Sequence, residues 1–252
     1  MKKFFLMTRG RTGSTAIIDV LNKSNNLCVF QELFLNYAFN KEKQHLVPPY
    51  DLWKKRGNVT SVIFKKISKE SRNIKDYLIS AEKIVTDTGV EALGFKLLSH
   101  NFDERPNLKT QLIKRDFKVV YLIRNIPRQV ISGMVAKLRG KYNAHDRENY
   151  NDDASYPINI SEFKSLVEWE TQAVANDIAM LESSDFEFIQ VRYEDFVHNH
   201  DVFFTRIFDF LNIPAEKLPN SSFSIMIKDL EQVVQNYQEV EHCLAEMGMS
   251  IE

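Results

Sequence analysis

Short apolar runs recur along the chain, separated by segments with the periodicity of amphipathic helices. The clearest run, 118–123, is β-branched, aromatic and continuously apolar, as expected of a strand that is covered on both faces. The same pattern predicts strands at 4–7, 27–30, 61–64, 92–98 and 186–191. Helix-like patterns occupy 14–21, 68–88, 127–138, 159–181, 200–212 and 225–246. This alternation predicts an α/β fold with a central, largely parallel sheet flanked by helices on both faces.

Two helix starts carry capping signals. Asn125 can cap the helix that begins near Pro127, a residue suited to a first helical turn. Asn159 and Glu162 have the spacing of a capping box. Two polar segments lack periodicity, and we interpret 40–58 as a connection and 139–158 as either a lid or a surface loop.

The length and charge of the chain limit the possible functions. Its 252 residues suit one large α/β domain, or at most two small ones, and we expect a single domain over 1–252. The net charge of −1 argues against a general nucleic-acid binder, so any anion site must come from local arginines. No apolar run is long enough to cross a membrane, and residues 1–7 lack the apolar stretch of a signal peptide. We therefore expect a cytoplasmic protein.

The cysteines and histidines do not form a metal-binding pattern. Cys28 and Cys243 are far apart in the sequence, which favours two reduced thiols over a metal site. His198 and His200 form an H-x-H pair without further ligands nearby, which favours a solvated loop. We therefore expect no metal site.

The segment between the run 4–7 and the helix 14–21 is suited to an anion. Gly10 and Gly13 let an anion approach the backbone, while the free N–H groups and the dipole of the following helix attract it. Arg9 and Arg11 add donors that can bind a phosphate or sulfate in pairs, so both are candidate ligands. The loop is not a Walker A motif, because only two residues separate its glycines and no lysine follows. An ordinary strand-to-helix turn is the alternative.

Arginines also follow two later strands. Arg124 comes directly after the strand 118–123, and the segment 192–195 follows the strand 186–191. Ligands of parallel α/β sheets bind beyond the carboxyl ends of the strands. We therefore expect these residues to lie near the first loop.

Two sequence motifs together resemble a known family. Residues 11–15 read R-T-G-S-T after an N-terminal strand, and residues 121–128 read Y-L-I-R-N-I-P-R, with Ser132 eight residues after Arg124. In this order they resemble the sulfotransferases that use 3′-phosphoadenosine 5′-phosphosulfate (PAPS). Weaker similarities at 191–196 and 210–213 extend the resemblance over residues 4–213. The first loop contains arginine in place of lysine and no R-K-G segment occurs, which favours the bacterial and carbohydrate-type branches.

The resemblance implies a fold and a binding site. The fold would be the P-loop-kinase-like sulfotransferase fold, with PAPS as co-substrate, 3′,5′-ADP (PAP) as product and no metal requirement. Arg124 and Ser132 would hold the 3′-phosphate, and Tyr193 would lie near the adenine. The 5′-phosphosulfate would be held by Arg11, Thr12, Gly13, Ser14 and Thr15.

Sulfuryl transfer to a hydroxyl requires a base, and two residues are candidates. Glu32 follows the strand 27–30, and its segment F-Q-E-L-F is similar to a P-x-E-[YL]-F-like segment of carbohydrate-type members, although it lacks the proline. A glutamate at a helix start that interacts with the dipole is the alternative. His100, which follows the strand 92–98, is the rival base, as some sulfotransferases use histidine. Lys96 either contacts the sulfate or packs its stem on the core.

The resemblance favours transfer to a hydroxyl of a carbohydrate or another small molecule. A P-loop-like small-molecule kinase is one alternative, and it predicts a Walker lysine that this sequence lacks. A non-catalytic nucleotide- or anion-binding module is another, and it predicts no acidic or imidazole group beside the loop. Glu32 and His100 are therefore the residues that distinguish the enzyme from this module.

Overall fold

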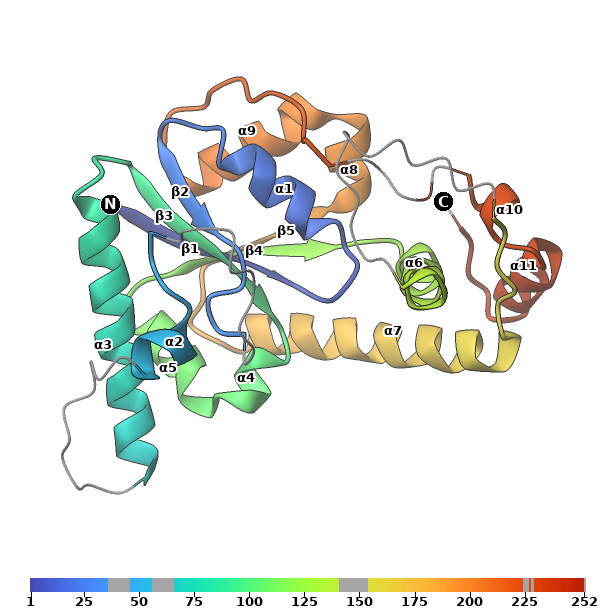
Figure 1. Ribbon diagram of the computed structural model, residues 1–252, viewed down its shortest axis with the longest axis horizontal. Coiled ribbons are helices and arrows are strands. Elements are labelled where there is room, and N and C mark those ends of the chain that lie inside the picture. Colours follow the sequence, from blue (N-terminus) through green and yellow to red (C-terminus); the bar gives the residue numbers. More distant parts are fainter. Residues whose placement is uncertain (36–45, 56–65, 141–153, 224–226, 228, 252) are drawn as a thin grey trace.

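A parallel β-sheet forms the centre of the protein (Figure 1). The computed structural model describes residues 1–35, 46–55, 66–140, 154–223, 227 and 229–251, and within these ranges the sheet has five strands. They are β1 (Lys2–Thr8), β2 (Leu27–Phe30), β3 (Ala92–Leu98), β4 (Lys118–Ile123) and β5 (Phe188–Arg192). Their order is β2-β3-β1-β4-β5, and each neighbouring pair is parallel. All carboxyl ends therefore meet at one edge.

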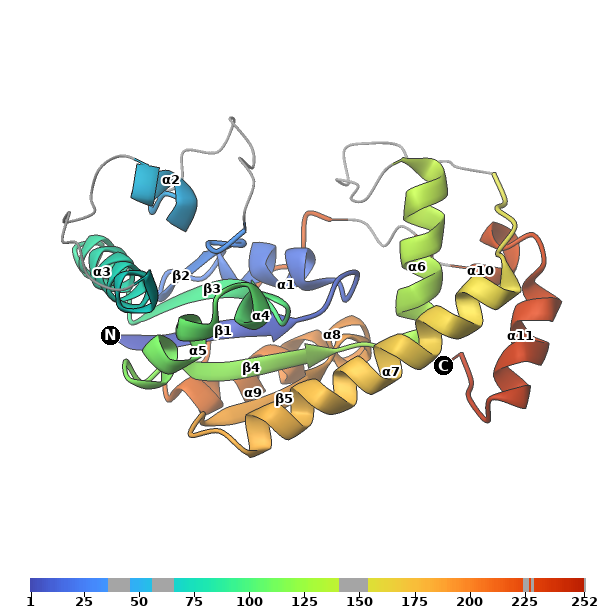
Figure 2. The same ribbon diagram turned by 90° about the horizontal axis from the view of Figure 1, so that it is seen from below.

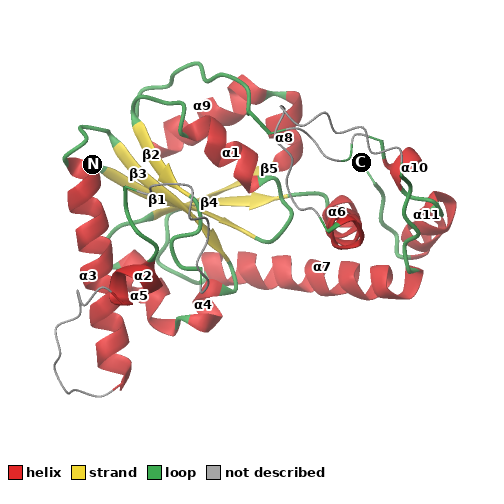
Figure 3. Ribbon diagram, in the orientation of Figure 1, coloured by secondary structure: helices red, strands yellow, loops and turns green. Residues whose placement is uncertain are grey.

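Helices cover both faces of this sheet (Figure 3). Helices α1, α8 and α9 pack on one face, and α2 to α5 pack on the other together with the carboxyl end of α7. Figure 2 shows α7 continuing past the carboxyl edge of the sheet toward α6 and α11. The helices are α1 (Ser14–Leu21), α2 (Tyr50–Lys55), α3 (Lys66–Thr86), α4 (Asn101–Glu104), α5 (Pro106–Ile113), α6 (Ile126–Arg139), α7 (Ile160–Glu182), α8 (Tyr193–His198), α9 (His200–Leu211), α10 (Leu230–Val233) and α11 (Tyr237–Glu246).

The apolar core consists of three clusters, and β1 contributes to two of them. Phe5 and Met7 face the cluster on the α3 and α5 side, whereas Phe4 and Leu6 face the cluster on the α1 and α9 side. Successive side chains of a strand point to opposite faces, so a strand covered on both sides is apolar throughout. The third cluster joins α6 and α7 to α10 and α11, beyond the sheet.

Gly94 makes room for an aromatic ring in the sheet. It pairs with Phe4 across β3 and β1, and a Cβ atom at Gly94 would lie 2.3 Å from Cζ of Phe4. Only the absence of a side chain lets the Phe4 ring lie across β3. The close contact explains why a glycine interrupts this otherwise bulky strand.

Most of the expected elements are present. The strands 27–30, 92–98 and 118–123 have the predicted limits, and β5 is displaced by one or two residues from 186–191. Both expected caps form: the Asn125 side chain accepts a hydrogen bond from Arg128 N at 3.0 Å, and Asn159 accepts one from Glu162 N at 2.9 Å. The fold is the predicted α/β sheet with helices on both faces.

The helix expected over 225–246 is wrong as one element, because the described part of it is divided into α10 and α11. Between them Val234 forms a bridge with Tyr156, and the Asn236 side chain accepts from Ile158 N at 2.9 Å. The backbone around Val234 pairs with Tyr156 instead of continuing the helical hydrogen bonds, so the helix is interrupted there. The expected connection 40–58 contains α2, while α4 and α5 were not predicted. The strand candidate 61–64 and most of 139–158 lie outside the described residues.

Cys28 and Cys243 are both free thiols, the first half-buried and the second buried. Within the described ranges we find no group of three or more His, Cys, Asp or Glu side chains placed to hold a metal ion. No helix in the same ranges has both the length and the apolar character needed to cross a bilayer.

We expect Gly94→Ala to destabilise the protein, because the new methyl group would overlap the Phe4 ring. Overpacking of this kind costs about 1–3 kcal/mol of unfolding free energy, measurable by urea denaturation. Gly10→Ala is the control, since a Cβ atom there meets nothing within 4 Å and should change the free energy by about 0.5 kcal/mol or less. The cost of Gly94→Ala should shrink in a Phe4→Leu background. Equal stabilities of the two alanine variants would contradict the overlap.

Candidate active site

The loop between β1 and α1 turns sharply at two residues. Arg11 and Gly13 have positive φ angles of 65° and 81°. Gly13 O accepts hydrogen bonds from the N–H groups of Ala16 and Ile17, at 3.0 and 3.4 Å, and so starts α1. The N–H groups of the first helical turn therefore face the carboxyl edge of the sheet, where Ser14 is buried and Thr15 is half-buried. This is a site that favours an anion.

Two threonine hydroxyls fix the base of this loop. Thr8 Oγ1 and Thr12 Oγ1 lie 2.5 Å apart, and Thr8 Oγ1 also donates to Leu122 O at 3.2 Å. Both threonine side chains are buried. The Thr12 hydroxyl thus joins the loop to β1 and β4, which leaves its backbone N–H as the group available to a ligand.

Gly13 brings the loop into direct contact with Tyr193, the first residue of α8. A Cβ atom at Gly13 would lie 2.1 Å from Cε2 of the Tyr193 ring. The positive φ and the close contact together exclude other residue types. Burial raises the pKa of the Tyr193 hydroxyl, and the charge of Arg124 partly offsets this effect. Tyr193 was expected near a bound adenine, and the structure places it beside the loop.

Arg124 joins the ends of β1, β4 and β5. It follows β4, its Nη1 donates to Arg11 O at 3.0 Å, and its guanidinium carbon lies 4.6 Å from the centre of the Tyr193 ring. Burial lowers the pKa of its guanidinium, while Tyr193 and Glu194 act in the opposite direction. Within the described part of the chain no carboxylate forms an ion pair with it, so its charge remains available to a ligand.

Arg11 extends from the loop toward α6. Its Nη2 donates to Ser132 Oγ at 3.3 Å, and Ser132 is only 6% exposed. A Cβ atom at Gly133 would meet Cγ of Arg11 at 3.7 Å, so this face of α6 lies against the arginine. The structure therefore brings together four expected residues that are distant in sequence, namely Arg11, Arg124, Ser132 and Tyr193.

The site contains more buried donors than acceptors. The Nε atoms of Arg124 and Arg128 and Nε2 of Gln129 are buried and have no hydrogen-bond partner. Burying such groups unpaired costs about 1–3 kcal/mol each, a cost that an oxygen-rich anion would remove. An oxygen-rich anion such as a phosphate therefore suits these residues. Arg128 and Gln129 were not among the residues expected from the sequence.

Arg9, a candidate ligand from the sequence, makes most of its contacts with α7. Its Nε donates to Glu170 at 2.6 Å, its Nη1 donates to Asp177 at 3.2 Å and Ser99 at 3.0 Å, and its guanidinium stacks on the Trp169 ring. Burial alone would lower the pKa of Arg9, but the two carboxylates outweigh it and raise the pKa. The side chain thus links the loop to α7, and two carboxylates balance its charge. No local sequence signal marks these partners, which lie on a distant helix.

Glu32 forms an ion pair with Lys96, at 2.5 Å between Oε1 and Nζ. Lys96 pairs with Leu6 in register, and Leu6 faces α1, so Lys96 projects to the α1 side of the sheet. Lys96 is 8% exposed, so its ammonium group is buried and is paired with the Glu32 carboxylate. Glu32, two residues past β2, therefore lies at the carboxyl edge on the same face as the start of α1. Among the described residues, Oε2 of Glu32 has no partner.

His100 lies at the start of α4 and is more accessible than Glu32. Its side chain is 53% exposed, and its closest charged neighbour is Glu104, with 4.0 Å between Nε2 and Oε1. No contact joins it to the β1–α1 loop in the part of the chain that the structure describes. The two candidate bases thus differ in environment, because only Glu32 is held by a buried cation.

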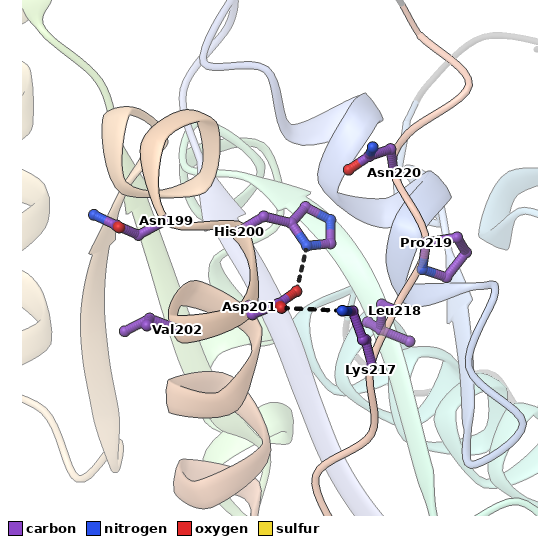
Figure 4. A pocket seen from close by; sticks show the side chains of 8 residues that line it. All are labelled: Asn199, His200, Asp201, Val202, Lys217, Leu218, Pro219 and Asn220. Carbon is purple, nitrogen blue, oxygen red and sulfur yellow. Dashed lines mark hydrogen bonds and ion pairs between the residues drawn. The ribbon is translucent and has the colours of Figure 1, made fainter.

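A separate cavity of about 460 Å³ lies between the start of α9 and the segment 217–220 (Figure 4). Asp201 is its central charge, with Oδ1 at 3.3 Å from His200 Nδ1 and Oδ2 at 3.9 Å from Lys217 Nζ. Its lining residues are Asn199, His200, Asp201, Val202, Lys217, Leu218, Pro219 and Asn220. None of the expected site residues lines this cavity, so we locate the candidate active site at the carboxyl edge of the sheet.

The chain resembles proteins of one known family. The chain matches the model of the sulfotransferase family over residues 4–217. Curated proteins gave no significant match. Among solved structures, a sulfotransferase from Alicyclobacillus acidocaldarius is 13% identical, with a TM-score of 0.47 and coverage of 100% of this chain and 97% of that one. Mouse SULT7A1 complexed with PAP is 9% identical, with a TM-score of 0.46 and coverage of 86% and 60%.

The region matched by the family model contains the β1–α1 loop, Arg124, Ser132 and Tyr193. It covers most of the 252 residues. The chain therefore belongs to the sulfotransferase family, enzymes that transfer the sulfuryl group of PAPS.

Proposed function

We propose that this sulfotransferase acts on a hydroxyl of a carbohydrate or another small molecule, with Glu32 as the general base and residues 1–252 as one domain. The observation that supports it most is the position of the Glu32–Lys96 pair, on the same sheet face and edge as the start of α1. A carbohydrate acceptor is supported by the resemblance of residues 30–34 to a segment of carbohydrate-type enzymes.

The nucleotide is held at two anionic positions. The loop residues Arg11 to Thr15 hold the 5′-phosphosulfate through backbone N–H groups and the Arg11 guanidinium. Arg124 and Ser132 hold the 3′-phosphate, and Tyr193 lies near the adenine. This assignment is supported by the contacts that link Arg11 to Ser132 and Arg124 to Tyr193. Arg9 is left out, because Glu170 and Asp177 already neutralise it.

When bound, PAPS supplies a sulfuryl group attached to a phosphate that can leave. Arg11 stabilises the negative charge that develops on the departing phosphate oxygen, together with the N–H groups at the start of α1. Catalysis of this kind depends mainly on positioning and on fixed charges. The positive φ of Arg11 is consistent with such a role, since strained backbone often occurs at functional sites.

Glu32 accepts the proton of the acceptor hydroxyl through Oε2. Its other oxygen is held by Lys96, which fixes the orientation of the carboxylate. Lys96 is thus a positioning residue. His100 is the weaker candidate base, because its imidazole is exposed and faces Glu104.

The experiment that tests the function is transfer of radiolabelled sulfate from PAPS to a panel of carbohydrates, lipids and small alcohols. We expect transfer to a hydroxyl compound, with carbohydrates the best acceptors. No transfer to any class, from a protein that binds 3′,5′-ADP, would contradict the proposed acceptor chemistry.

Arg124→Ala should lower the affinity for 3′,5′-ADP at least ten-fold, or about 1.4 kcal/mol. Affinity for 5′-AMP should change little, because that nucleotide lacks the 3′-phosphate. Calorimetry in metal-free buffer measures both. Arg115→Ala is the control, since Arg115, two residues after α5, is bound to Glu82 on α3. Equal affinities of the unmodified protein for the two nucleotides would argue against a 3′-phosphate site.

Arg11→Ala should reduce kcat by a larger factor than it reduces affinity for 3′,5′-ADP. The physical reason is that its charge acts on a negative charge that grows only as the bond breaks. Steady-state transfer and calorimetry on the same preparation give the two factors. If they are equal, Arg11 only tethers the nucleotide.

Glu32→Gln should lower kcat by about 10²–10⁴, the range for loss of a general base, and leave nucleotide affinity unchanged. Lys96→Met, which keeps the carboxylate but removes its partner, should lower kcat less. His100→Asn should remain close to the unmodified enzyme. The measurement is steady-state transfer with nucleotide affinity determined in parallel. An active Glu32→Gln together with an inactive His100→Asn would assign the base to His100.

A further inference from the structure

Gln129 on α6 is a buried amide without a partner. Its side chain is 3% exposed, and Nε2 forms no hydrogen bond. A buried donor of this kind destabilises the folded protein unless a ligand or water pairs with it. An apolar residue of similar size could fill the same space without leaving a donor unpaired. The amide of Gln129 is therefore not explained by packing alone.

The position of Gln129 on the helix directs it toward the nucleotide site. Ser132 and Gly133 follow it by three and four residues, so the three lie on one face of α6. This face meets Arg11, which donates to Ser132 Oγ at 3.3 Å and lies 3.7 Å from a Cβ atom at Gly133. Helical side chains lean toward the helix N-terminus, so the Gln129 side chain is directed toward the start of α6, which follows the segment that carries Arg124.

The apolar core of the C-terminal helices lies on the opposite face of α6. The residues of that face pack in the third cluster, and they are Val130, Ile131, Met134 and Val135. Gln129 lies between Ser132 and Gly133 around the helix axis, and these two residues form the side of α6 that meets Arg11 of the β1–α1 loop.

Two acceptors near the start of α6 are already used by other donors. Asn125 Oδ1 accepts from Arg128 N at 3.0 Å, and Glu194 Oε1 accepts from Asn125 N at 2.8 Å. The buried groups left without a hydrogen bond include two further donors, Nε of Arg124 and Nε of Arg128, and one acceptor, Oε2 of Glu194, which lies 3.6 Å from Nε of Arg192. Several unpaired donors in the first turn of α6 and in the segment before it suit a ligand that offers several oxygen acceptors, as a phosphate does.

We propose that Gln129 is a further ligand of the nucleotide's 3′-phosphate, to which its amide N–H donates a hydrogen bond. This inference rests on the proposed function, which assigns Arg124 and Ser132 to the same phosphate. A neutral donor at this position adds a directed bond without adding to the repulsion between Arg124 and Arg128. Gln129 thereby contributes to the preference for nucleotides that carry a 3′-phosphate.

The test compares Gln129→Leu with the unmodified protein by calorimetry, with 3′,5′-ADP and 5′-AMP as probes. We expect affinity for 3′,5′-ADP to fall about ten-fold and affinity for 5′-AMP to stay within about two-fold, since a tenfold change is one hydrogen bond to a charged group. The Tm of the free protein should not fall, because leucine removes an unpaired donor. Gln129→Glu should weaken 3′,5′-ADP binding further, since its carboxylate would repel the phosphate.

Gln111→Leu is the matched control. Gln111 is also buried in a helix, but its Nε2 donates to Ser71 Oγ at 2.8 Å. Its replacement should lower the Tm and leave both nucleotide affinities unchanged. The two glutamines thus separate a ligand-binding amide from a structural one.

Three results would contradict the proposal, and they separate the role of Gln129 from the 3′-phosphate site as a whole. A protein that binds both nucleotides equally before any substitution would contradict the proposed 3′-phosphate site itself, and this inference with it. A protein that prefers 3′,5′-ADP, and keeps that preference in Gln129→Leu and Gln129→Glu, would overturn the inference alone. Equal losses for both nucleotides with a lower Tm would also overturn it, because they would make Gln129 a structural residue.

Discussion

The close contact between Gly13 and the Tyr193 ring is the constraint on which the site depends. It requires a residue without a Cβ atom and with a positive φ, and it presses the β1–α1 loop against the start of α8. Arg124 stacks on the same ring and holds the Arg11 carbonyl, so one aromatic side chain connects the ends of β1, β4 and β5. The parallel sheet brings these strand ends to one edge, and the Tyr193 ring then fixes the distances between them.

The arginines near this edge differ in their partners, and the partners decide what each can do. Arg9 is bound to Glu170 and Asp177, so its charge is neutralised and its function is to hold the loop on α7. Arg124 has aromatic and carbonyl partners but no carboxylate in the described part of the chain, so its charge stays available. The sequence places Arg9 and Arg11 in one loop with the same apparent chemistry. Only the three-dimensional structure separates an arginine that is paired with carboxylates from one that is not.

The sequence was sufficient where the cause of a feature is local. The strand 118–123 was predicted to the residue, because burial on both faces leaves an uninterrupted apolar run, and Asn125 was identified as a cap from its place before Pro127. The break between α10 and α11 was missed, because it is imposed by pairing with Tyr156, far away in the sequence. The motifs located Arg124 and Ser132, but Lys96 became the partner of Glu32 only once β2 and β3 were aligned.

Helix α6 links the site to the C-terminal part of the protein. One face carries Ser132 against Arg11, and the other packs on α7, α10 and α11 in the third cluster. The Asn125 side chain also donates to Ser250 O at 3.2 Å, which ties the start of the helix to the C-terminal segment. The C-terminal helices therefore support the site by fixing the position and tilt of α6. Because α6 holds both the hydroxyl of Ser132 and the unpaired amide of Gln129, a small shift of this helix would move the two groups together relative to Arg11.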